Sequence, residues 1–249
     1  MSGPVVVTAS AGSFPGLLEA LRAIPVPVEE APLMSFAPPT DWAPVDRALA
    51  NLGAFEAVAF TSPRAAGAFA ARAAERGVAP AAAGHPTLWA AGAGTAQALG
   101  NRLGAVRRPP ERAVGEKGAA AALAEVLLEE GVAGPVLFPC GDIRRDELPV
   151  RLRHEGVEVV DVVCYRSVLA DEVDARRAAE RARVLVVASP SVADLLARAC
   201  PAEPRPPMLA VGPTTAAAAR ASGWPAGATA AKPTVEALAA GVRALLDVR

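Results

Sequence analysis

Several residue types that support common binding and catalytic chemistries are scarce in this sequence. The chain has only three cysteines (Cys140, Cys164 and Cys200) and two histidines (His85 and His154), with no C-x-x-C pair and no ligand cluster, so we expect neither a disulfide nor a metal site. A net charge of −1 excludes a globally basic nucleic-acid-binding protein. Charges interrupt every apolar stretch before the ~20 residues that a membrane-spanning helix needs.

The sequence also lacks the glycine-rich and nucleophilic motifs of many enzymes. Neither G-x-G-x-x-G nor G-x-x-x-x-G-K-[ST] occurs, so no nucleotide cofactor is expected. There is no G-x-S-x-G elbow, triad-like order or clustered carboxylate pair, and nucleophilic hydrolysis therefore has no visible catalytic group. The start of the chain, MSGPVVVTAS, has no basic segment followed by a long apolar core, and we expect a cytoplasmic protein.

The sequence does contain an internal repeat: motifs of the first half recur in the second half. Three pairs of matching positions recur in the same order: Leu17 and Leu148, Ser62 and Ser189, Thr95 and Thr215. The spacing between partners shrinks steadily, as expected for a duplication followed by loop shortening. The period is too long for a solenoid, so the repeat predicts two domain-sized copies, which would place a binding site between them.

Short β-branched runs alternate with helical patterns along both copies. Strands are expected at 5–10, 57–62, 87–92, 135–140, 157–165, 184–189 and 208–212, and helices at 14–22, 63–75, 95–103, 145–154, 171–183 and 233–247. This alternation is typical of α/β proteins, and strands this apolar are expected to be buried and parallel. The predicted fold is therefore two flavodoxin-like, doubly wound parallel-sheet domains.

Two extended segments, 31–39 and 161–170, fall at corresponding places shortly after the second strand of each copy. If the chain crosses between domains at both, residues 1–35 and 168–249 form one discontinuous domain, and residues 36–167 form the other. Two sequential halves remain an alternative on the residues alone.

Four strand ends place small hydroxyl or glycine residues just before a helix. The candidates are Thr61, Ser62, Gly94, Thr95, Ser189, Ser191, Thr214 and Thr215. Free N–H groups at helix starts bind anions, and ligands bind at the carboxyl ends of strands in open α/β sheets. The alternative is that these residues are ordinary helix caps, which contribute ~1 kcal/mol each.

Two arginines and one tyrosine add candidate functional groups to these turns. Arg64 and Arg144 follow strand ends and could clamp carboxylates, although arginines at helix starts are often simply solvated. Tyr165, the only tyrosine, ends a valine-rich strand. A phenol is protonated at neutral pH and could donate a proton to a leaving group, or it could be an ordinary strand-end aromatic residue.

The order and spacing of several short motifs carry a family resemblance. They are Phe60–Pro63, Gly92–Ala96, the Gly141-Asp142 turn with Leu148 and Leu152, Gly156–Tyr165, Val187–Ser191 and Gly212–Ala216. Over nearly the whole chain the sequence resembles the uroporphyrinogen-III synthase family. The resemblance implies two flavodoxin-like domains joined by a two-stranded linker ladder, with a cleft between them.

The resemblance also implies an activity that needs no cofactor. Such an enzyme dehydrates the linear tetrapyrrole hydroxymethylbilane, inverts ring D through a spiro intermediate and closes the macrocycle that leads to haem, sirohaem and cobalamin. Tyr165 would donate a proton to the departing hydroxyl, while the helix starts and Arg64 or Arg144 would hold carboxylates. The expected partner is the substrate alone, handed over by the preceding deaminase to a monomeric enzyme, with no nucleic acid or membrane involved.

Two positions depart from the family pattern. Thr8 is followed by Ala9-Ser10 where the family commonly has Thr-Arg-Pro, and the fourth strand ends in Cys140-Gly141 where Arg-Gly is common. Two cationic contacts are therefore expected to be missing; Lys232 could compensate, or the carboxylates there could stay in solvent. The main alternative function is a two-lobed protein that binds or senses a small anion or tetrapyrrole without catalysis.

Overall fold

The computed structural model describes residues 3–80, 86–99, 105–110, 118–144 and 146–246. The chain forms two compact units, which we call unit 1 (Met1–Ser35 with Val168–Arg249) and unit 2 (Phe36–Ser167). His85, residues 100–103 of one predicted helix and the predicted helix start at position 145 lie outside the described residues.

Unit 1 contains a parallel sheet covered by helices on both faces. Within the described residues its strands are β1 (Val5–Val7), β2 (Val28–Glu30), β9 (Val184–Val187), β10 (Met208–Ala210) and β11 (Ala228–Thr229), in the order β11-β10-β9-β1-β2. Every pairing is parallel. One core contains side chains of α8 (Glu172–Arg181), α9 (Pro190–Ala199) and α10 (Pro213–Ala221), and the other contains those of α1 (Leu17–Arg22) and α11 (Val235–Leu246).

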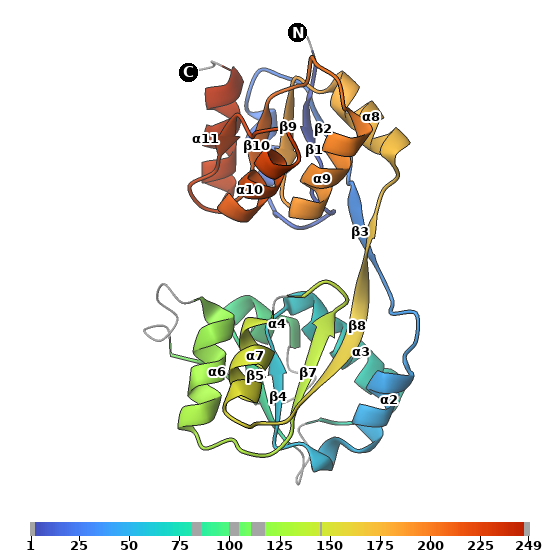
Figure 1. The fold of residues 1–249 in the computed structure, drawn as a ribbon, viewed down its shortest axis with the longest axis vertical. Helices are drawn as coiled ribbons and strands as arrows, with labels where there is room; N and C mark the ends of the chain where they lie inside the picture. The colour runs from blue at the N-terminus through green and yellow to red at the C-terminus, as the bar shows by residue number, and fades with distance from the viewer. Residues whose placement is uncertain (1–2, 81–85, 100–104, 111–117, 145, 247–249) are drawn as a thin grey trace. The chain divides into compact units, whose positions relative to one another are not determined.

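Unit 2 has the same layered construction. Its sheet has the order β3-β8-β7-β4-β5-β6, with β3 (Met34–Ala37), β4 (Ala57–Phe60), β5 (Thr87–Ala90), β6 (Val106–Arg107), β7 (Val136–Gly141) and β8 (Val159–Leu169). One core contains residues of α2 (Ala43–Ala50), a 3₁₀ turn at Leu52–Ala54, α3 (Pro63–Glu75) and α4 (Ala93–Leu99). The opposite core contains residues of α6 (Ala119–Glu129) and α7 (Glu147–His154), and Figure 1 shows these two helices together on one side of the sheet.

Strand β4 shows why these sequences form buried parallel strands. All four of its residues are buried, and their side chains alternate between the two cores, with Val58 and Phe60 on one face and Ala57 and Ala59 on the other. Alternation of side chains across a strand covered on both faces requires apolar residues at every position. The prediction of buried parallel strands is confirmed for β1, β4, β7, β9 and β10.

Strands β3 and β8 contain both boundaries between the units and are neighbours in one sheet. The backbone N–H of Ala170 donates to Leu33 O over 3.0 Å, and the side chain of Arg166 donates to Pro38 O over 3.2 Å. Because the numbering rises on one strand as it falls on the other, the two strands run antiparallel.

The predicted helix at 63–75 is confirmed to the residue, whereas the one at 14–22 begins only at Leu17. Gly16 precedes it with φ 83°, a left-handed conformation that an α-helix cannot include. Helices α2 and α6 were not predicted. None of the helices in the described parts of the chain is long and apolar enough to cross a membrane.

Candidate functional site

The carboxyl ends of three parallel strands meet at one edge of the sheet of unit 2. Strands β4, β5 and β7 end at Phe60, Ala90 and Gly141. Strand β8 runs parallel to β7 and continues beyond it, with Tyr165 as the register partner of Gly141. The turn that holds Thr61 and Ser62, and the start of α4, which contains Gly94 rather than following it, therefore lie at the same edge as Tyr165. This edge is where ligands bind in open α/β sheets.

At this edge an arginine, a phenylalanine and the tyrosine form a stack, which we call the Arg64–Phe36–Tyr165 cluster. The guanidinium carbon of Arg64 lies 3.5 Å from the centroid of the Phe36 ring and 6.0 Å from that of the Tyr165 ring. Phe36 and Tyr165 pack edge to face, with ring centroids 5.6 Å apart and ring planes at 80°. This geometry suits both cation–π and aromatic pairing and fixes the three side chains relative to one another.

The polar ends of this cluster are available to a ligand. Among the described residues, no carboxylate or carbonyl pairs with the guanidinium of Arg64, and none bonds the hydroxyl of Tyr165. Arg64 is exposed and Tyr165 is partly exposed. A guanidinium with unused N–H donors beside a phenol can bind an anionic group and can stabilise negative charge on the phenol oxygen.

The starts of α3 and α4 lie next to the cluster and next to each other. Ser62 is the N-cap of α3 and its hydroxyl accepts from Ala65 N over 3.4 Å. A Cβ on Gly94 would lie 3.9 Å from Pro63 Cγ, so the two helix starts are neighbours. Thr61 is partly exposed and Gly94 is exposed, whereas Thr95 is only 5% exposed and is largely part of the packing.

Arg144 differs from Arg64 because carboxylates already engage it. Its guanidinium lies 3.1 Å from Asp161 and 3.2 Å from Asp146. Cys140 is 3% exposed, and burial raises the pKa of its thiol to about 11, so a neutral thiol occupies this strand position. Any ligand of Arg144 would have to exchange with the carboxylate of Asp146 or Asp161.

The carboxyl edge of unit 1 has its own set of helix starts. Ser189 is the N-cap of α9, but its side chain makes no capping bond to the helix. Ser191 is partly exposed and Thr214 exposed, whereas Thr215 is 2% exposed. Lys232 is exposed in the segment between β11 and α11, and thus also follows the carboxyl end of a parallel strand.

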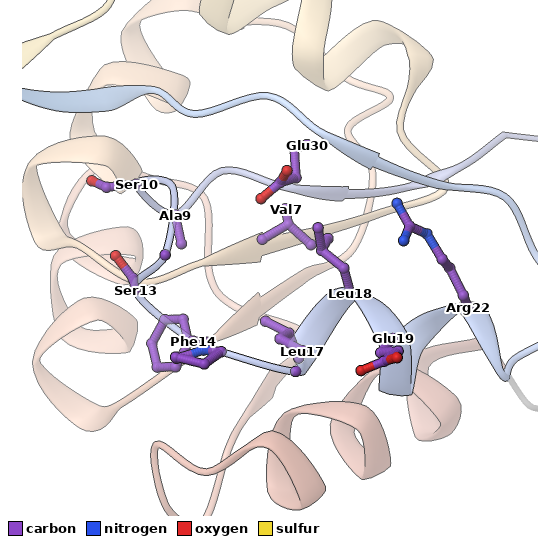
Figure 2. Close-up of a pocket in the computed structure, with 13 residues that line it drawn as sticks. Val7, Ala9, Ser10, Ser13, Phe14, Leu17, Leu18, Glu19, Arg22 and Glu30 are labelled. Atoms are coloured by element: carbon purple, nitrogen blue, oxygen red, sulfur yellow. The ribbon is translucent and has the colours of Figure 1, made fainter.

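A hollow of about 310 Å³ adjoins the end of β1 in unit 1. Figure 2 shows its three sources: strand residues Val7 and Glu30, the loop from Ala9 to Phe14, and side chains of α1 that include Arg22. Ala9 is 7% exposed and contributes little but a methyl group. Among the residues that line the hollow, Arg22 is the cation and Glu19 and Glu30 are carboxylates, and none of the three was a predicted site residue.

Phe36, Gly141 and Asp142 also lie at the carboxyl edge of the unit 2 sheet but were not among the predicted site residues. Gly141 and Asp142 belonged to a recognised motif, and their position at a strand end was a usable signal. Phe36 carried no signal of its own, because its contacts with Arg64 and Tyr165 join segments that are far apart in the sequence.

Similar solved structures and a matching family model point to one enzyme family. The structure is similar to that of a mutant uroporphyrinogen III synthase from the extremely thermophilic bacterium Thermus thermophilus, with a TM-score of 0.62 and 16% identity over 98% of this chain and 99% of that chain. It is equally similar to uroporphyrinogen-III synthetase from Helicobacter pylori 26695, with a TM-score of 0.62 and 18% identity over 99% and 100%. The family model described as uroporphyrinogen-III synthase HemD matches residues 15–240. The chain therefore belongs to the uroporphyrinogen-III synthase family.

Proposed function

We propose that Tyr165 is the proton donor of this enzyme, which is a cyclising hydro-lyase of tetrapyrrole biosynthesis acting on hydroxymethylbilane. The observation that carries the proposal is the partly exposed phenol at the carboxyl edge of the unit 2 sheet, held by Phe36 beside the unengaged guanidinium of Arg64. No other tyrosine occurs in the sequence.

In the proposed step the phenol transfers its proton to the hydroxyl group of hydroxymethylbilane. The carbon–oxygen bond breaks, water leaves, and the adjacent pyrrole supplies the electron pair that forms the azafulvene electrophile. The guanidinium of Arg64 offsets the negative charge left on the phenol oxygen. When the ring closes and a pyrrole carbon loses its proton, that proton balances the one donated earlier, so the reaction needs no external acid or base.

Carboxylates of the substrate would be held by backbone N–H groups and hydroxyls at the helix starts. The proposed binding residues are Thr61, Ser62, Arg64, Gly94, Thr95 and Arg144 in unit 2, and Ser189, Ser191, Thr214 and Thr215 in unit 1. Thr95 and Thr215 are almost buried, so each would contribute its backbone N–H rather than its hydroxyl. Arg64 would contribute most, because its N–H groups are free, and the exposed Lys232 could supply a further cation.

The two units would be flavodoxin-like domains that arose by duplication, with β3 and β8 as the linker ladder. Unit 1 has the order β2-β1-β9-β10-β11, and unit 2 without β3 has the order β8-β7-β4-β5-β6. If β7 and β8 correspond to β1 and β2, both follow the flavodoxin order 2-1-3-4-5. The repeat partners Ser62 and Ser189 cap their helices with φ −129° and −126° and ψ 127° and 136°, which supports the same correspondence.

The alternative of a two-lobed binding protein without catalysis has less support, because the family match covers a catalytic family over most of the chain. We further propose that the enzyme works as a cytoplasmic monomer that receives its substrate from the preceding deaminase. Sedimentation at several protein concentrations tests the monomer, and the rate with and without the deaminase at a fixed substrate supply tests the transfer.

The proposal is tested by giving purified protein hydroxymethylbilane generated enzymatically, then oxidising the products and separating the type I and type III uroporphyrin isomers. Wild-type protein is expected to give an excess of type III, and Tyr165→Phe is expected to give mostly the type I isomer that forms spontaneously, with an unchanged unfolding midpoint. Wild-type turnover by Tyr165→Phe would remove the phenol from the mechanism.

A further inference from the structure

The end of strand β7 lies directly beneath the reactive end of the Tyr165 side chain. A Cβ added to Gly141 would lie 2.5 Å from Cζ, 2.7 Å from Oη and 2.8 Å from Cε2 of Tyr165. Real Cβ atoms essentially never come this close to another heavy atom. The phenol therefore rests on the bare backbone of Gly141, and its hydroxyl occupies space that a side chain at this position would take.

Backbone conformation does not explain the glycine at this position. Gly141 is absent from the described glycines with positive φ, so an L-residue could adopt its φ without strain. The register between β7 and β8 shifts between Cys140, which pairs with Val163, and Gly141, which pairs with Tyr165. Such irregularities redirect side chains at strand ends, and here the shift makes Tyr165, rather than Cys164, the partner of Gly141.

The next residue, Asp142, holds the β8 backbone in place beside the phenol. Its N–H donates to Tyr165 O over 3.1 Å, and its Oδ1 accepts from Ser167 N over 2.8 Å and from Ile143 N over 2.9 Å. Phe36 meets the Tyr165 ring edge to face. With the strand held on both sides of Tyr165, a group placed on Gly141 would displace the ring and its hydroxyl rather than the backbone.

We propose that Gly141 is a positioning residue for Tyr165. Because Gly141 has no side chain, the phenol can occupy one fixed position against its backbone. The inference rests on the proposed role of Tyr165 as proton donor. Ordinary contact begins at 3.4 Å, so a methyl group on Gly141 forces the end of the ring to move by roughly an ångström. Displacements of about 1 Å at a reacting group cost up to roughly 10²-fold in rate. Because the ring end is the free end of a side chain, the fold tolerates the change.

The experiment compares Gly141→Ala, Tyr165→Phe and the double variant with the wild type, measuring kcat, KM and the unfolding midpoint. Gly141→Ala is expected to lower kcat by roughly 10²-fold with little change in KM. In the Tyr165→Phe background the same substitution is expected to lower kcat by less than about a further twofold. Gly67→Ala in α3 is the matched control, because a Cβ there meets no atom within 4 Å and so requires no side chain to move.

The single tyrosine allows a direct readout of ring position. Protein labelled with 3-fluorotyrosine gives one ¹⁹F resonance, which Gly141→Ala is expected to shift and Gly67→Ala is expected to leave in place. If Gly141→Ala does not fold, replacing Tyr165 by Leu in the same chain should restore the unfolding midpoint, because the colliding ring is gone. Failure of that rescue would show that the methyl group collides with something else and would overturn the proposal.

The outcomes separate this inference from the proposed function. Full activity of Gly141→Ala, or an equal loss in both backgrounds, overturns the positioning role while an inactive Tyr165→Phe still supports the proton donor. Wild-type turnover by Tyr165→Phe overturns both. An unshifted ¹⁹F resonance in Gly141→Ala also contradicts the positioning role, whatever the kinetics.

Discussion

Replacing Phe36 by leucine should loosen both polar groups of the candidate site at once. The ring of Phe36 carries the Arg64 guanidinium at 3.5 Å on its face and meets Tyr165 edge to face at 5.6 Å. An exposed cation–π contact contributes ~0.5–1 kcal/mol and an aromatic pair ~0.5–1.5 kcal/mol. Phe36→Leu thus removes about 1 to 2.5 kcal/mol of the interaction energy that holds Arg64 and Tyr165 in place. If the transition state loses all of this stabilisation, kcat/KM falls roughly 5- to 70-fold.

The assay is the initial rate of type III isomer formation over a range of hydroxymethylbilane concentrations. Phe36→Tyr is the control, because it keeps the face of the aromatic ring, and its kcat/KM should stay close to that of the wild type. Arg64→Lys, which removes the planar guanidinium, should cost less in the Phe36→Leu background than in the wild type, because the stack is already gone. A value of kcat/KM within twofold of wild type for Phe36→Leu would refute the reasoning.

Three further measurements test other parts of the structure. Ser62→Ala should lower the free energy of unfolding by about 1 kcal/mol, and Ser189→Ala by less, because only Ser62 makes a capping bond; urea titration of both compares them directly. The hydrogen bond from Arg72 lowers the pKa of Asp46 from 3.8, so this pair contributes stability above that pH and loses it as the pH falls below it. Asp46→Asn should therefore lose less stability than wild type on acidification, and parallel acid transitions would contradict this. With a thiol reagent at pH 8, Cys200 should react first, because it is partly exposed, whereas Cys140 and Cys164 are buried and burial raises the pKa of both their thiols; equal rates would contradict the burial.

The sequence predicted regular elements best where both ends carried a local signal. Helix α3 has Ser62 and Pro63 at its start, and Gly77 follows its end with φ 68°, so its limits could be read directly. The start of α1 was wrong because the conformation of Gly16 depends on the loop around it. Helix α2 was missed, although Asp41, whose carboxylate accepts from Ala43 N, and Pro44 are start signals.

The candidate site was less predictable because its geometry depends on long-range contacts. Arg64 and Tyr165 were selected for their chemistry, but nothing in the sequence indicates that Phe36 stacks between them. Arg144 has the same local signal as Arg64, and only the folded chain shows that Asp146 and Asp161 engage it. Likewise, the exposure of Thr95 and Thr215 depends on packing that their turn sequences do not reveal.

The place of β1 in its sheet governs the order in which the chain can fold during synthesis. Strand β1 lies between β2 and β9, so one of its edges can be paired only after residue 184 has been made. Unit 2 is one continuous segment that ends at Ser167, before β9 begins. A nascent chain must therefore keep the Val5–Val7 segment from aggregating while unit 2 folds, because an unpaired apolar edge is a template for association. A released fragment that ends just before β9 should thus contain a folded unit 2 preceded by an unprotected, protease-sensitive Val5–Val7 segment.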